Sequence, residues 1–350
     1  MAWRGVIDEY GELLDLPKNS PVITLLEGGT PLIPLPVIGG MLGKQVTLFT
    51  KFEGLNPTGS FKDRGMTVAI SEAAGRKAQS VICASTGNTA ASAAAYAARA
   101  GIRCVVLIPQ GKVAMGKLAG ALAYGSRVIQ VEGSFDDALT LVVQLTQKHP
   151  ITLVNSLNPY RIEGQKTGAF EICDALGSAP DWLCLPVGNA GNITSYWKGF
   201  REYHRRKNTG LPHILGVQAE GSAPLVLGHP VEKPETVATA IRIGKPARGE
   251  QALEAAQESG GRIIAVSDQM ILEMQKQLAS EGVWVEPASA AGLAGMLSEV
   301  RNQRLDVNGK TIVAICTGHG LKDPDIITKR APEIQLLPPS LGELEKALLG

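Results

Sequence analysis

Apolar runs that end in Gly-, Ser-, Asn- or Thr-rich loops and then pass into helical patterns recur along this chain. The clearest runs are residues 81–84, 104–108, 128–131, 152–154, 183–187 and 311–316. Nearly continuous apolar strands that alternate with helices indicate a mainly parallel sheet covered on both faces. We therefore predict an α/β fold. Ligands bind such sheets beyond the carboxyl ends of the strands, where each of these polar loops lies.

Size and composition narrow the class of protein. The chain has 350 residues, 44% of them apolar and 19% charged, enough for one large or two medium domains. A net charge of +1 gives no argument for a nucleic acid or an anionic membrane as partner. The first residues lack a signal-peptide core, and no apolar segment is long enough to cross a bilayer, so we expect a cytoplasmic protein.

The five cysteines are widely separated and include no Cys-x-x-Cys pair. Several lie inside apolar runs, which is typical of small buried hydrophobes in a reducing compartment. No metal site is predicted.

Residues 56–65, with the sequence Asn-Pro-Thr-Gly-Ser-Phe-Lys-Asp-Arg-Gly, place Lys62 in a turn beside both charge signs. Burial and nearby cations lower the pKa of a lysine and free its lone pair, as a Schiff-base amine requires. The alternative is a surface lysine in a turn, where most lysines lie.

Two glycine-containing loops follow strands and open helices. Residues 188–192, Gly-Asn-Ala-Gly-Asn, precede a predicted helix over 193–200, so their N–H groups can converge on a phosphate. The loop lacks both the P-loop lysine and the Gly-x-Gly-x-x-Gly spacing, and an ordinary strand–helix turn is an equal alternative. Residues 85–89, Ser-Thr-Gly-Asn-Thr, can hold a carboxylate, although helix capping accounts for one or two of them.

Two further sets of polar residues follow strands. Asn155, Ser156 and Arg161 favour an anion, because arginine suits bidentate phosphate contacts. Thr317 offers a neutral hydroxyl beyond the last strand. A surface ion pair for Arg161 and a turn position for Thr317 are the alternatives. We expect an irregular segment over 229–257 and a solvated helix end for the cations of 201–207.

In this order and spacing, the motifs resemble the fold-type II pyridoxal-phosphate enzymes, and among them the threonine synthase family. The resemblance runs from Gly-Gly-Thr-Pro-Leu at 28–32 to Thr-Gly-His-Gly-Leu-Lys at 317–322. The form of residues 56–65 is typical of threonine synthases. The resemblance implies two doubly wound, mainly parallel sheets, with pyridoxal 5'-phosphate in the cleft between a discontinuous larger domain (1–65 and 156–350) and an inserted smaller one (66–155). It also implies a homodimer.

The resemblance also implies a role for each loop. Lys62 would hold the cofactor as a Schiff base and then act as acid and base. Asn88 would contact the cofactor's ring oxygen and Thr317 its pyridine nitrogen, which a hydroxyl cannot keep protonated as an aspartate would. The cofactor phosphate would be held by Gly188, Asn189, Ala190, Gly191 and Asn192. The substrate carboxylate would be held by Ser85, Thr86 and Thr89, and the substrate phosphate by Asn155, Ser156 and Arg161.

These roles predict conversion of O-phospho-L-homoserine and water to L-threonine and phosphate, by γ-elimination and β-addition of water. Two separate anion clusters favour a phosphorylated substrate over a plain amino acid. One alternative is a threonine/serine dehydratase of the same fold, which needs no substrate phosphate. Another, from a different class, is a non-catalytic protein that binds pyridoxal phosphate or another phosphate ligand.

Overall fold

Two sheets organise the chain in the computed structural model, which describes residues 2–85, 87–110, 115–133, 135–328 and 335–349. Every strand pair is parallel except β1 with β2, so the predicted α/β fold with two mainly parallel sheets is confirmed. The larger sheet has the spatial order β1 (Leu32–Pro34), β2 (Thr47–Phe52), β10 (Thr311–Cys316), β7 (Trp182–Pro186), β8 (His213–Ala219), β9 (Arg262–Val266). The smaller sheet has the order β5 (Arg127–Val131), β4 (Arg103–Pro109), β3 (Ser80–Ala84), β6 (Thr152–Leu153).

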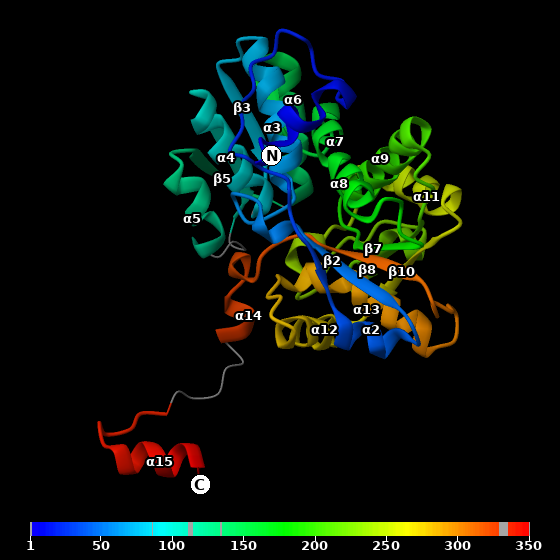
Figure 1. Cartoon of the computed structure of the whole chain (residues 1–350). Helices are drawn as coiled ribbons and strands as arrows, with labels where there is room; N and C mark the ends of the chain where they lie inside the picture. Colours follow the sequence, from blue (N-terminus) through cyan, green and yellow to red (C-terminus); the bar gives the residue numbers. More distant parts are fainter. Residues whose placement is uncertain (1, 86, 111–114, 134, 329–334, 350) are drawn as a thin grey trace.

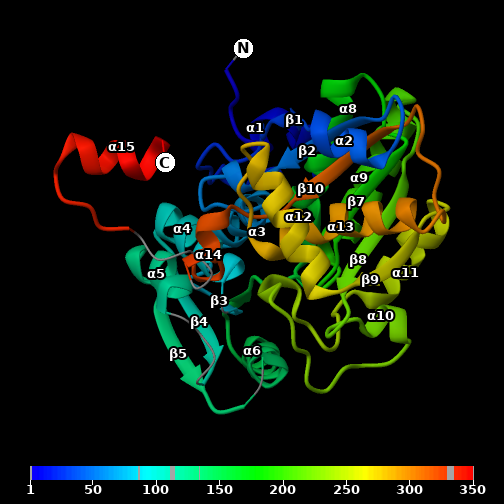
Figure 2. The same ribbon diagram turned by 90° about the horizontal axis from the view of Figure 1, so that it is seen from below.

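Helices cover both faces of the larger sheet (Figures 1 and 2). One face packs on α2 (Pro36–Leu42), α12 (Asp268–Ser280) and α13 (Pro287–Arg301). The other face packs on α8 (Thr167–Leu176), α9 (Gly191–Lys207) and α11 (Gly249–Glu258). All five residues of β7 are buried, as a strand between two helical layers requires.

The smaller sheet is covered in the same way. The helices α3 (Lys62–Gly75), α4 (Asn88–Ala100) and α5 (Met115–Ala123) pack on one face, and α6 (Phe135–Lys148) packs on the other. α4 is rich in alanine, the best helix former, and ends at Gly101, which adopts the left-handed conformation (φ 68°). α7 (Pro159–Gln165) lies against α3 and connects the two sheets.

The remaining elements are short. They are α1 (Val6–Tyr10), η1 (Gly11–Leu13), η2 (Glu53–Leu55), α10 (Pro224–Leu227), η3 (Thr239–Ile241), η4 (Gly320–Lys322), α14 (Asp325–Thr328) and α15 (Leu341–Leu349). α15 has no buried residue and stands apart from the body of the molecule (Figure 1). In the part of the chain that the structure describes, no helix combines the length and apolar character needed to cross a membrane.

The strand orders place the predicted site loops at the switch points of both sheets. In the smaller sheet the chain runs outward from β3 to β5 and returns as β6 on the other side of β3. In the larger sheet it runs outward from β7 to β9 and returns as β10 on the other side of β7. Loops on either side of such a reversal diverge and leave a crevice. The four loops predicted to bind ligands follow β3, β6, β7 and β10.

Some predictions of local structure need correction. The segment 229–257 is irregular only to Arg248, apart from η3, because α11 begins at Gly249. The cations of 201–207 do end a helix, since they occupy the last turns of α9. The predicted domain boundary at 65/66 falls inside α3, and that at 155/156 falls between β6 and α7. As domain limits, both boundaries stay predictions.

Candidate active site

A cleft of about 790 Å³ lies at these switch points, within the usual size range of small-molecule sites. Most of the predicted site residues line it. They are Lys62, Ser85, Asn88, Thr89, Asn155, Ser156, Gly188, Asn189, Ala190, Gly191, Asn192 and Thr317. Thr86 lies outside the described residues, and Arg161 is not among the lining residues.

Lys62 is the first residue of α3, and its position depends on β10. The N–H of Phe61 donates to the carbonyl of Thr317 (3.0 Å), and Ser60 pairs with Gly318, so the turn is bonded to the end of that strand. Burial and the positive charge of Arg161 lower the pKa of Lys62 to about 7, although Glu286 opposes this. An amine with this pKa is substantially neutral at physiological pH and can act as a nucleophile or base.

Thr317 is buried, and its hydroxyl is held by a neighbouring helix. The Oγ atom of Ser289, in α13, lies 2.9 Å from Thr317 Oγ1 and accepts from the N–H of Gly318 at 2.9 Å. No charged group is bonded to the Thr317 hydroxyl in the described residues. This end of the cleft therefore offers a neutral partner.

Asn88 is the first residue of α4, and its amide reaches across the cleft. Its Nδ2 donates to both carboxylate oxygens of Glu286, at 2.9 and 3.2 Å. Glu286 precedes Pro287 at the start of α13 and is buried. This contact connects α4, on the smaller sheet, with the start of α13, on the larger sheet. It also orients the Asn88 amide, which is predicted to contact the ring oxygen of the cofactor.

The loop 188–192 suits a phosphate group. Ala190 adopts a left-handed conformation (φ 63°), which a non-glycine residue rarely does, and turns the chain directly into α9. The side chain of Asn192 is buried, and neither its Oδ1 nor its Nδ2 has a hydrogen-bond partner among the described residues. A Cβ atom at Gly188 would lie 3.0 Å from Ile241 Cα, so the loop packs closely against η3 and has no room for a side chain at this position. Unpaired buried polar groups at a helix N-terminus fit the phosphate of the predicted cofactor.

The loops after β3 and β6 are bonded to each other. The Asn155 amide accepts from the N–H of Ala84 (2.9 Å) and donates to its carbonyl (2.8 Å). Ser85 Oγ accepts from the N–H groups of Gly87 and Ala90, at 3.3 and 3.2 Å. Asn155 therefore uses its amide on the protein backbone, and Ser85 does cap its helix, while both still line the cleft.

Arg161 lies behind the cleft wall rather than in it. Only 1% of its surface is exposed, and its Nη1 donates to the carbonyl of Val154 at 2.8 Å. In this arrangement Arg161 acts on the cleft through its charge, which lowers the pKa of Lys62. Direct contact with a substrate phosphate stays a prediction that this geometry does not support.

Sequence reasoning missed six charged residues of the cleft wall: Glu232, Lys233, Glu235, Arg242, Glu286 and Lys322. Lys322 Nζ donates to the carbonyl of Thr58, in the turn before Lys62, at 3.0 Å. One signal for Glu286 is present in the sequence. Glu286 stands directly before a proline and a run of small residues, a pattern typical of the start of a helix, and the other polar loops also precede helices. No clear strand precedes it, so the pattern of apolar run and polar loop does not find it.

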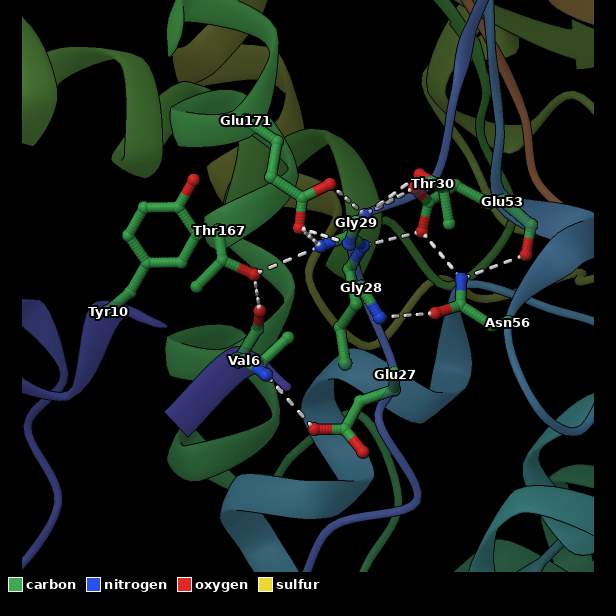
Figure 3. Close-up of polar contacts among 12 residues, drawn as sticks. Val6, Tyr10, Glu27, Gly28, Gly29, Thr30, Glu53, Asn56, Thr167 and Glu171 are labelled. Atoms are coloured by element: carbon green, nitrogen blue, oxygen red, sulfur yellow. Dashed lines mark hydrogen bonds and ion pairs between the residues drawn. The ribbon is translucent and has the colours of Figure 1, made fainter. Parts of the chain in front are cut away.

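A buried ionic cluster lies at the start of α3, and Figure 3 shows its two carboxylates, Glu53 and Glu171. The Arg64 guanidinium donates to Glu53 (2.6 and 2.8 Å) and to Glu171 (2.8 Å). Lys51 Nζ donates to Glu171 at 2.6 Å. Burial opposes ionisation of Glu171, but the charges of Arg64 and Lys51 outweigh it and lower its pKa to about 2. The cluster thus joins β2, η2, α3 and α8 around the lysine-bearing turn.

Within the described ranges, no group of three or more His, Cys, Asp or Glu side chains is arranged to hold a metal ion. All five cysteines are buried and free, in agreement with the sequence prediction.

Comparison with known proteins identifies the family to which the chain is similar. Residues 23–318 match the family described as pyridoxal-phosphate dependent enzyme. The chain is 54% identical to the threonine synthase of Synechocystis sp., covering 97% of this chain and 91% of the relative. It is 56% identical to those of Halalkalibacterium halodurans (92% and 91% covered) and Mycobacterium leprae (96% and 93% covered).

Solved structures with the same fold are more distant in sequence. Maize serine racemase superposes with a TM-score of 0.73 at 23% identity, covering 86% of this chain and 91% of that one. Threonine deaminase isoform 2 from Solanum lycopersicum gives 0.75 at 24%, covering 91% and 86%. At this identity the likeness shows the fold alone.

Proposed function

This chain belongs to the threonine synthase family of pyridoxal-phosphate-dependent enzymes, and we propose that it converts O-phospho-L-homoserine and water to L-threonine and phosphate. The observation that carries the proposal is Lys62, an amine with a pKa near 7 that faces a cleft with a phosphate-binding helix N-terminus.

The residues of the cleft fit pyridoxal phosphate. Lys62 would hold the cofactor covalently, the loop 188–192 its phosphate, Asn88 its ring oxygen and Thr317 its ring nitrogen. When bound, the cofactor withdraws electrons from the substrate's α-carbon and so acidifies the neighbouring protons. Because Thr317 is neutral, this withdrawal is moderate, and more of the proton transfer depends on Lys62.

Lys62 performs the proton transfers. Its Nζ would take the proton from Cα of the substrate, because burial and the charge of Arg161 disfavour the ammonium form and leave the amine free to act as a base. A proton would then leave Cβ and phosphate would depart from Cγ. Cγ would gain a proton, the hydroxyl of water would add at Cβ, and Cα would regain a proton, which gives L-threonine and phosphate. Glu286 opposes the effect of Arg161 on Lys62 and so helps the amine to carry a proton between these steps.

The substrate's two anionic ends would lie against different loops. Ser85 and Thr89, which lie beside the first residue of α4, would hold the carboxylate together with Thr86. Asn155 and Ser156, after β6, would border the phosphate. Arg161 contributes its positive charge from behind this second loop. A cleft between two sheets can also narrow on substrate and exclude water until the addition step.

We also propose a cytoplasmic homodimer, which the resemblance to the family supports. Free, buried cysteines suit a reducing compartment. A molar mass near twice 36.9 kDa in light scattering would support the dimer.

The direct test is to incubate the purified holoenzyme with O-phospho-L-homoserine and measure threonine and phosphate, which should appear in equal amounts. Release of phosphate without threonine, or no reaction, would contradict the proposal.

Lys62→Ala should abolish both turnover and the borohydride-reducible bond to the cofactor, because no other amine occupies its position. A suitable control is Lys346→Ala, since Lys346 is exposed on α15 and, among the described residues, is bonded to Glu343 of its own helix alone. If Lys62→Ala kept either property, the role of Lys62 would be wrong.

A further inference from the structure

The short loop after β6 is held from two sides by different parts of the molecule. Asn155 is bonded by its amide to Ala84, the last residue of β3 in the smaller sheet. The carbonyl groups of the next two residues, Ser156 and Leu157, accept hydrogen bonds from Arg248, which directly precedes α11 on the larger sheet. Arg248 Nε donates to Ser156 O at 2.8 Å, and Nη2 donates to Leu157 O at 3.3 Å. The chain therefore passes between the two sheets through a loop anchored to both.

Arg248 also belongs to the segment that supports the cofactor loop. It is the N-cap residue of α11, at the end of the long irregular stretch between α10 and α11 (Figure 2). The N–H of its neighbour Ala247 donates to Asn189 Oδ1 at 3.3 Å. Two consecutive residues thus contact the loop 188–192 and the loop 155–157.

The two loops lie directly against each other. A Cβ atom at Gly191, the first residue of α9, would lie 3.5 Å from Ser156 Cβ. A displacement of Ser156 would therefore change the spacing between the phosphate-binding helix terminus and the adjacent part of the cleft. Arginine suits this task because its rigid fork of N–H groups can hold two carbonyls at once, which a lysine ammonium does not reproduce.

Resting on the proposed function, we propose that Arg248 is a positioning residue that fixes Ser156 against the cofactor cradle and so sets where the substrate phosphate binds. The leaving phosphate must stand in line with the bond that breaks, and a misplacement of about 1 Å can cost about a hundredfold in rate. Arg248 acts through the backbone of residues 156–157, and its half-buried charge also favours a dianion nearby.

The test compares Arg248→Ala and Arg248→Lys in the holoenzyme. Both should raise the KM for O-phospho-L-homoserine about tenfold or more. Both should also weaken the binding of inorganic phosphate to the holoenzyme, measured by calorimetry, by a similar factor. The dissociation constant of pyridoxal phosphate, from its absorbance on binding, should change less than about twofold, because the cradle keeps its own contacts. Arg248→Lys keeps the charge, so its failure to restore binding isolates the role of the two carbonyl contacts.

Arg201→Ala is the matched control, because Arg201 is also a half-exposed arginine that is bonded to α11. Its Nη1 donates to the carboxylate of Glu258, the last residue of that helix, at 2.7 Å. It should leave all three measurements unchanged.

Wild-type KM and phosphate affinity in Arg248→Ala would overturn the proposal. So would a loss of cofactor affinity as large as the loss of phosphate affinity, since Arg248 would then support the cradle. Full rescue by lysine would also overturn it, by showing that charge alone suffices. If the wild-type enzyme made no threonine, the proposed function would fail, yet phosphate binding to the holoenzyme would still decide the role of Arg248.

Discussion

At the scale of single residues, the chemistry of the cleft depends on how the charge of Lys62 is controlled. The amine lies at the start of α3, between the positive charge of Arg161 and the negative charge of Glu286. Burial lowers the pKa of Lys62 most, and Arg161 adds to this. A buried arginine that does not line the cleft thus lowers the pKa of Lys62 from a distance.

Arg161→Met should raise the pKa of Lys62, because removal of a positive charge favours the ammonium form. Only the neutral amine attacks an aldehyde, so the rate at which the apoprotein forms its imine with pyridoxal phosphate should rise with pH. The midpoint should lie near pH 7 in the wild-type protein and at higher pH in the variant. Stopped-flow absorbance measures the rate of imine formation at each pH. The pH should run from about two units below the expected midpoint to about three units above it.

The control for that experiment is Arg76→Met, because Arg76 follows the same helix but is exposed and paired with Glu72. It should leave the midpoint unchanged. An unshifted midpoint in Arg161→Met would show that Arg161 does not act on Lys62.

At the scale of elements, the ionic cluster decides where α3 begins. Glu171 of α8 receives contacts from Arg64 of α3 and Lys51 of β2, and all three side chains are at most 6% exposed. Glu53 of η2 completes the cluster through Arg64. Since Arg64 is two residues from Lys62, this cluster holds the turn that carries Lys62 as well as the helix.

Glu171→Gln should destabilise the protein by about 3–5 kcal/mol, because it leaves two buried cations with one carboxylate. Urea unfolding at neutral pH measures the loss. The exposed pair Glu343–Lys346 supplies the control, since Glu343→Gln should cost less than about 1 kcal/mol. Equal, small effects would show that the cluster adds no net stability.

The pH dependence of this contribution has a definite sign. The pKa of Glu171 is lowered from 4.5 to about 2 in the folded chain. The unfolded chain therefore binds more protons between these values, and the stabilisation is complete above pH 4.5 and is lost as the pH falls toward about 2. Glu171→Gln should remove this part of the acid sensitivity.

At the scale of the whole molecule, the site exists because two sheets reverse their strand order next to each other. The loops after β3 and β6 come from one sheet, and those after β7 and β10 from the other. Contacts such as Asn88 with Glu286 and Arg248 with Ser156 connect them. The function thus depends on the relative position of two layers rather than on either layer alone.

The C-terminal helix contributes little to this architecture. No residue of α15 is buried, and it stands off the two sheets (Figures 1 and 2). A chain ending at Ser340 should therefore keep its free energy of unfolding within about 0.5 kcal/mol, measured by urea titration. Deletion of residues 1–10 is the contrasting control, because it removes the buried Val6 and Ile7, worth about 1.5–3 kcal/mol each. A large loss in the C-terminal truncation would mean that α15 has a binding surface in solution.

Much of the fold follows from local pattern. The apolar runs at 81–84, 183–187 and 311–316 correspond to β3, β7 and β10, because strands buried on both faces must be apolar throughout. β8 and β9 were not predicted. β9 begins with Arg262, and its other residues are mostly only half-buried, so its sequence signal is weaker. The end of the irregular segment at Arg248 was also missed, since α11 has no strong capping residue.

By itself, the sequence determined the fold class, the family and four of the loops that line the cleft, and it singled out Lys62, because each of these depends on contiguous residues. Only the tertiary structure decided that Arg161 lies behind the wall, that Glu286 holds Asn88 from 198 residues away, and that Arg248 anchors Ser156. The physical reason is that these depend on contacts between distant segments. Burial and neighbouring charge, which set the pKa of Lys62, arise only when the two sheets pack together.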